Sequence, residues 1–187
     1  MSGDLPFACT CGTVTGTLKA KAISRGTRAT CGCKDCRAAV KHLTGKTVGQ
    51  VEIFLTTPHH IHIASGFNQL SALNLSPKGP HRIYATCCKA TVATVPRSSR
   101  MGFASLTVDR FTDPSATGPV KSAFFRTEAD GKRHLGVPRA ISGIVSRGIK
   151  AQVSGGWKRS AFHGPDGKIA VPIDLITPDA KAAAYDI

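Results

Sequence analysis

Seven cysteines fall into three short groups, and they are the residues of this chain best suited to chemistry. The groups are Cys9–Gly12 (CTCG), Cys31–Cys36 (CGCKDC) and the pair Cys87–Cys88. Disulfide partners are normally dispersed through a chain, whereas thiolates two or three positions apart converge readily on one soft cation such as zinc. Seven thiols suffice for two zinc ions, provided that one of the two sites does not take all four of its ligands from cysteine.

The first and third groups predict a structural zinc site. Cys9-x-Cys11-Gly12 is typical of a compact knuckle, in which glycine permits a positive φ and amide N–H groups then point at the sulfurs. A structural zinc needs four ligands, and Cys87 and Cys88 are the remaining pair outside the central group. Neighbours on a strand point to opposite faces, so either a turn brings both thiols to the ion or only one of them binds it. The alternative without metal is a set of buried, small thiols.

The central group predicts a catalytic zinc site. Cys31, Cys33 and Cys36 offer three protein ligands, and three ligands plus one exchangeable position are typical of a catalytic zinc. The alternatives are a redox dithiol, because Cys33 and Cys36 form a CxxC motif, and a second structural metal. His42 is a candidate for a fourth ligand.

The elements that position these groups are mostly strands. Alternating or β-branched segments predict strands over 12–19, 47–56, 60–64, 82–86, 91–95 and 103–108. Helical spacing and capping residues predict helices over 34–43, 138–151 and 178–185. Cys36 would lie in the first turn of the helix over 34–43, where the helix dipole and nearby Lys34 favour a thiolate.

Length and composition set the outer bounds. A chain of 187 residues with no apolar stretch long enough to span a bilayer fits one domain, and the segment before Leu5 lacks the features of a secretory signal. We expect a zinc-binding core over 1–110, an extension over 111–187 packed on it, and a cytoplasmic location, without membrane attachment. The formal charge of +14 suits anionic small molecules, nucleic acid or acidic partners.

The order of the cysteine motifs resembles the glutathione-dependent formaldehyde-activating enzyme (GFA) family, which is grouped with centromere protein V. The resemblance covers roughly residues 5–108 and consists of Cys9-x-Cys11-Gly12, Cys31-x-Cys33-x-x-Cys36 and an aromatic strand that ends in cysteine. It implies a mainly β, zinc-binding β-tent (GFA-like) fold with short helices and a C-terminal extension. It also implies structural ligands in the first motif and a catalytic zinc on the second, one thiol of which leaves the metal when glutathione binds.

The third motif departs from the family pattern. That pattern is aromatic-Cys-x-x-Cys-Gly, whereas this chain reads Tyr84-Ala85-Thr86-Cys87-Cys88-Lys89. Alanine replaces the first cysteine, Cys87 is shifted, and Lys89 stands in place of the glycine. The departure indicates a divergent branch of the family.

The expected function is that of a zinc-dependent carbon–sulfur lyase-like enzyme acting on a thiol adduct such as S-hydroxymethylglutathione. A glutathione-type substrate carries two carboxylates, which basic residues beside the metal motifs would bind. The candidates are Arg37, Lys41, Arg82 and Lys89. The alternative is a zinc-stabilised basic module that binds nucleic acid or an acidic partner without catalysis.

Overall fold

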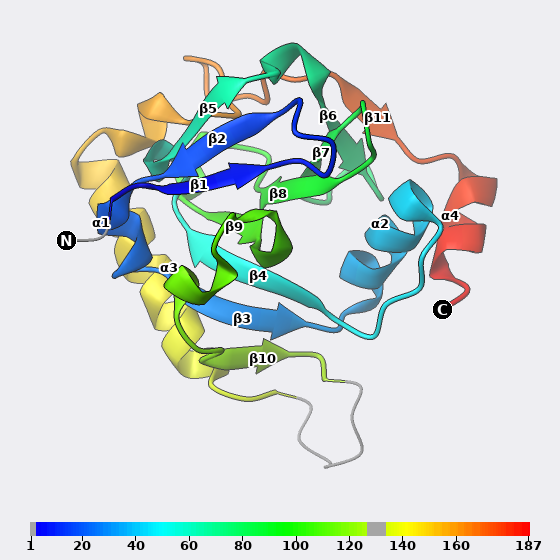
Figure 1. The fold of residues 1–187 in the computed structure, drawn as a ribbon, viewed down its shortest axis with the longest axis horizontal. Coiled ribbons are helices and arrows are strands. Elements are labelled where there is room, and N and C mark those ends of the chain that lie inside the picture. Colours follow the sequence, from blue (N-terminus) through cyan, green and yellow to red (C-terminus); the bar gives the residue numbers. More distant parts are fainter. Residues whose placement is uncertain (1–2, 127–133) are drawn as a thin grey trace.

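Two β-sheets form the framework of the chain (Figure 1). The structure, a computed structural model, describes residues 3–126 and 134–187. The smaller sheet has the order β1-β2-β5 and comprises Leu5–Ala8, Thr15–Leu18 and Ile61–Ser65. The larger sheet has the order β10-β3-β4-β9-β8-β7-β6-β11. In that order its strands are Ser122–Phe124, Thr27–Cys31, Val51–Thr56, Ala104–Thr107, Thr91–Val95, His81–Ala85, Leu70–Asn74 and Ile173–Leu175.

Four α-helices lie around these sheets, and they gather in two places (Figure 1). They are α1 (Ala20–Ile23), α2 (Lys34–Thr44), α3 (Val137–Val153) and α4 (Pro178–Tyr185). The C-terminal helix α4 lies beside α2, where Ala38, Ala39 and Ala184 belong to one buried cluster. Every helix in the described part of the chain is too short or too polar to span a bilayer.

The segment after residue 110 completes the larger sheet at both edges. Strand β10 pairs parallel to β3, with Phe124 opposite Cys31, and β11 pairs parallel to β6, with Asp174 opposite Leu73. Both edge strands have three residues and approach their partners in parallel, so their pairing depends on long connections through the chain.

The main core fills the space between the two sheets. Phe7 of the small sheet and Phe54 of the large sheet both meet Phe111 edge to face, at centroid separations of 6.3 and 6.2 Å. All three rings are almost completely buried. Edge-to-face pairs add to the free energy gained from burial, so this trio fixes one sheet against the other.

The mainly β architecture agrees with the sequence prediction. Each predicted strand overlaps an observed one, the strand over 91–95 matches β8 in both bounds, and the helix over 178–185 matches α4. Thr177 caps α4 as predicted, accepting a hydrogen bond from the Ala180 N–H. The sequence patterns missed β1, β3, β6, β10 and β11, because these strands have at most five residues and little polar–apolar alternation.

The phenylalanine trio gives a direct test of how the sheets are held together. Phe54→Ala should lower the free energy of unfolding by about 3–5 kcal/mol, because it leaves a cavity where a fully buried ring contacts Phe111. Phe67 is 42% exposed, so Phe67→Ala is the matched control and should cost no more than about 1 kcal/mol. Urea denaturation followed by circular dichroism measures both, and equal losses would contradict this view of the core.

Candidate metal centres and the cleft beside them

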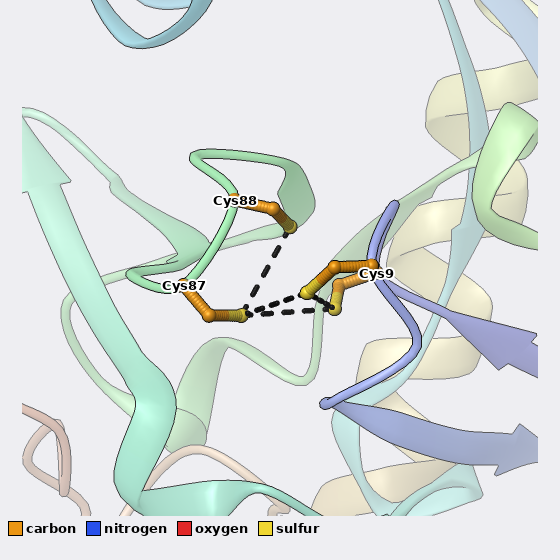
Figure 2. A group of neighbouring side chains, drawn as sticks. Cys9, Cys87 and Cys88 are labelled. Atoms are coloured by element: carbon orange, nitrogen blue, oxygen red, sulfur yellow. Dashed lines mark hydrogen bonds between the residues drawn. The ribbon is translucent and has the colours of Figure 1, made fainter.

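The four thiols of the first and third motifs meet at one point, although 76 positions separate Cys11 from Cys87. Their sulfurs all lie within 4.8 Å of one another. The closest pairs are Cys11–Cys87 at 3.3 Å, Cys9–Cys11 at 3.5 Å, Cys9–Cys87 at 3.9 Å and Cys87–Cys88 at 4.0 Å. A tetrahedron of thiolates about 2.3 Å from zinc has edges of about 3.8 Å. The four sulfurs therefore fit a single tetrahedral ion (Figure 2).

A knuckle after β1 positions Cys9 and Cys11. Gly12 has a φ of 80°, which closes the turn, and its N–H donates to the Cys9 carbonyl at 3.0 Å. The Val14 N–H donates to the Cys9 sulfur at 3.3 Å. The Thr13 hydroxyl and backbone N–H lower the pKa of the Cys11 thiol to about 6. The predicted knuckle is present, with an amide aimed at sulfur as expected.

A tight turn between β7 and β8 positions the other two thiols. The Ala85 N–H donates to the Ala90 carbonyl at 2.9 Å, and the Lys89 N–H donates to the Ala85 carbonyl at 2.8 Å. Cys87 and Cys88 lie inside this turn rather than on a strand, so the alternation of a strand does not apply to them. Figure 2 shows that the side chains of Cys87 and Cys88 both point toward Cys9. The turn brings both thiols of the pair to the cluster.

The three thiols of the central motif form a second cluster, where β3 leads into α2. Cys31 ends β3, and Cys33 is the N-cap of α2, where its sulfur accepts a hydrogen bond from the Cys36 N–H at 3.4 Å. The three sulfurs lie within 4.8 Å of one another. Among the described residues, no further Cys, His, Asp or Glu completes this group, so His42 is not part of it.

The neighbouring thiols give Cys33 the lowest pKa of the three thiols in this cluster. Hydrogen bonds from its neighbours Cys31 and Cys36 lower the pKa of Cys33, and the Cys36 N–H and the charge of Arg82 lower it further. Hydrogen bonds with Cys31 and Cys33, together with burial, raise the pKa of Cys36. A thiolate at Cys33 also faces the positive end of an 11-residue helix.

A buried arginine and a carboxylate accompany the three-thiol cluster. Arg82 of β7 is only 4% exposed, and its NH2 atom lies 3.5 Å from Oδ2 of Asp35. Its NH1 atom is buried without a hydrogen-bond partner among the described residues. The Tyr185 hydroxyl of α4 donates to Oδ1 of Asp35 at 2.6 Å. No local sequence pattern indicates this contact, because 150 positions separate the two residues.

A cleft runs beside both clusters. A cavity of about 150 Å³ under α2 has Cys36 and Arg82 in its wall. A larger hollow of about 620 Å³ has Cys88 of the four-thiol cluster in its wall. The two hollows adjoin, because they share the lining residues Val40, Val51, Thr91 and Thr107. We refer to these two adjoining hollows, to whose walls α2 and strands β4, β8 and β9 contribute, as the cleft beside the thiols.

The four basic residues predicted to bind substrate make different contacts in the structure. Arg82 lines the cavity, and its NH1 atom has no hydrogen-bond partner within residues 3–126 and 134–187. Arg37 donates to the Val48 carbonyl at 2.9 Å, and Lys41 donates to the Asp186 carbonyl, so both fasten chain segments. Lys89 is exposed, and its ammonium lies 5.5 Å from the centre of the Tyr84 ring. Lys46, which the sequence analysis did not single out, lines the larger hollow.

Comparison with known proteins gives a family without an activity. A family described as "Family of unknown function (DUF6151)" matches residues 1–139, a range that contains all seven cysteines and Arg82. No curated protein matches the chain.

The two clusters predict two metal ions per chain. Zinc-loaded protein should lose one ion in Cys9→Ser and the other in Cys31→Ser, because each serine removes a thiolate from one cluster only. Cys9→Ser should also lower the melting temperature more, since a four-thiolate metal contributes directly to folding. Elemental analysis after desalting and calorimetry measure both quantities. An unchanged metal count in both variants would contradict this assignment.

Lys89 allows a separate test of the turn that carries Cys87 and Cys88. Its φ of 58° lies in the left-handed region, which favours glycine, and such a conformation costs other residues about 1–2 kcal/mol. Lys89→Gly should therefore raise the free energy of unfolding by up to about 1 kcal/mol, because the greater freedom of glycine in the unfolded chain offsets part of the gain. Lys89→Ala is the control: it removes the side chain but retains the strain, and should give no gain.

Proposed function

The chain belongs to the DUF6151 family, whose function is unknown, and we propose that it is a zinc-dependent carbon–sulfur lyase-like enzyme acting on a thiol adduct. The substrate class is a hemithioacetal such as S-hydroxymethylglutathione. The observation that carries the proposal is the difference between the two clusters. Four thiols complete one tetrahedron, whereas three thiols beside a cavity leave one position of the other for an exchangeable ligand.

The family resemblance supports this proposal in two ways. The resemblance implies a β-rich zinc fold of two sheets with one structural and one catalytic zinc, and this chain has two sheets, a four-thiol cluster and a three-thiol cluster. Lys89 occupies the place of the family's glycine and has the backbone conformation that glycine adopts most easily. At this position the third motif therefore has a backbone conformation that suits glycine, although its residues differ from the family pattern. We assign the four thiols of Cys9, Cys11, Cys87 and Cys88 to one structural zinc.

The chain supplies the groups that such a reaction needs. Zinc on Cys31, Cys33 and Cys36 would lower the pKa of a bound thiol and stabilise negative charge on its sulfur. Arg82 lines the cavity, and its buried NH1 atom has no hydrogen-bond partner in the described part of the chain, so it suits a substrate carboxylate. Asp35 lies between Cys33 and Cys36 in the sequence, and Tyr185 and Arg82 fix both of its oxygens.

The reaction requires a group that accepts the hydroxyl proton of the adduct, and we propose Asp35 for this role. When the adduct breaks down, its hydroxyl loses a proton, a carbonyl forms, and the carbon–sulfur bond breaks with the electron pair remaining on sulfur. We assign the hydroxyl proton to Asp35, with Tyr185 and Arg82 as the residues that position it. In the reverse direction the thiolate attacks the aldehyde carbon and Asp35 returns the proton to the oxygen.

Substitutions in this network test the assignment. Asp35→Asn should lower the rate of exchange between glutathione, formaldehyde and their adduct by about 100-fold, because the general base is lost. Tyr185→Phe should lower it less, since only the positioning hydrogen bond is removed. Exchange spectroscopy by NMR on zinc-loaded protein measures these rates.

Tyr84→Phe is the matched control for Tyr185→Phe. The Tyr84 hydroxyl also donates to a carboxylate, that of Asp174, but this contact lies at β11 and should affect stability rather than rate. If zinc-loaded protein neither bound glutathione nor accelerated the exchange, the lyase proposal would be wrong. Salt-sensitive binding of RNA or DNA by the same sample would then favour the basic module.

A further inference from the structure

A second large hollow lies at the other end of β3, away from the three-thiol cluster. It measures about 720 Å³, a size typical of small-molecule sites, and lies between α1, α3 and the end of β4. Thr27, the first residue of β3, lines it, whereas Cys31 ends that strand. Four residue steps along the strand separate these positions by about 13 Å, and no cysteine is among the described residues that line this hollow.

The wall of this hollow is strongly basic. Its charged lining residues are Lys21, Arg25, Lys121, Arg139, Arg147 and Lys150. No Asp or Glu is among the described lining residues, and none of the six takes part in an ion pair with a described carboxylate. Burial lowers the pKa of His60 to about 4, and the charges around it, including those of Lys21 and Arg25, add to this effect. The hollow therefore attracts anions.

Buried polar groups without partners gather in the same place. The hydroxyls of Thr56 and Thr57, which are 1% and 2% exposed, have no hydrogen-bond partner among the described residues. The same holds for Nδ1 of His59 and for Nε and NH2 of Arg147. These are five of the seven such atoms in the described chain, and all of them belong to residues that line this hollow. Because each unmade hydrogen bond costs about 1–3 kcal/mol, the concentration points to a ligand with several acceptor oxygens.

One side of the hollow is apolar. Ile149 and Val153 of α3 line it, and they are 59% and 86% exposed, so they offer apolar surface to a ligand. We propose that the hollow is a second ligand site that binds a phosphate-bearing small molecule. Arg147, Thr56 and Thr57 hold the phosphate, and the uncharged body of the molecule lies against Ile149 and Val153. This site is independent of the proposed lyase activity, because it shares no lining residue with the cleft beside the thiols.

Calorimetric titration of the zinc-loaded protein with four probes tests this assignment. ATP and phenyl phosphate should bind at least about tenfold more tightly than inorganic phosphate, because they add contacts to the apolar wall, and adenosine should not bind measurably. ATP binding with no phenyl phosphate binding would identify a nucleoside phosphate as the ligand class. Equal affinity for ATP, phenyl phosphate and inorganic phosphate would overturn the proposal. It would also be overturned if an RNA oligonucleotide bound more tightly than these anions and the Arg147→Gln variant described below left the RNA affinity unchanged.

Three variants separate a ligand site from a merely charged surface. Thr57→Val should leave the melting temperature unchanged or raised, since it removes an unsatisfied hydroxyl, and should weaken ATP binding about three- to tenfold. Arg147→Gln should weaken it tenfold or more. Lys78→Gln is the control, because it removes the same charge at an exposed position outside the hollow. If Thr57→Val lowered the melting temperature and left ATP binding unchanged, or if Lys78→Gln weakened binding as much as Arg147→Gln, the site would be refuted.

Discussion

Four thiols lie within 4.8 Å of one another where the two sheets meet, and as thiolates they would repel unless a cation lay among them. Cys9 and Cys11 follow a strand of the small sheet, and Cys87 and Cys88 lie in a turn of the large one. The cluster therefore lies where the two sheets meet, and the Phe7–Phe111–Phe54 contact links the same two sheets within the core. A metal at this point would join two halves of the framework, so losing it would affect folding rather than chemistry alone.

The three-thiol cluster depends on a different kind of support. Cys31 is held by a central sheet pairing to β4, and Cys33 and Cys36 by the first turn of α2. The helix α4 packs on α2 and brings the Tyr185 hydroxyl to Asp35, so the C-terminal end of the chain helps to shape a site whose thiols are all encoded before residue 40. Rigid backbone on one side and a packed helix on the other are suited to holding an open metal site in one geometry.

The part of this site that could be predicted from sequence is the part that is local. Cys31, Cys33 and Cys36 lie within six positions, and Gly12 adjoins Cys11, so spacing alone indicates which thiols cooperate. The convergence of Cys87 and Cys88 could not be decided, because it depends on a turn that a lysine completes at a positive φ. The pairing of Asp35 with Tyr185 and the edge strands β10 and β11 depend on contacts across about half the chain or more, which no local pattern encodes.

Local sequence also does not show which of the basic residues share a site. Its Lys and Arg residues are spread along the sequence, and those beside the cysteine motifs were the natural candidates for binding substrate. Yet Arg37 and Lys41 fasten backbone, whereas Lys21 and Arg25 at α1 and Arg147 of α3 come from two distant parts of the sequence and line one hollow. Repulsion among these cations raises the free energy of the folded chain, and no described carboxylate lines the hollow to offset it. A fold that accumulates such charge beside unsatisfied Thr56 and Thr57 hydroxyls is stabilised by the anion that satisfies both.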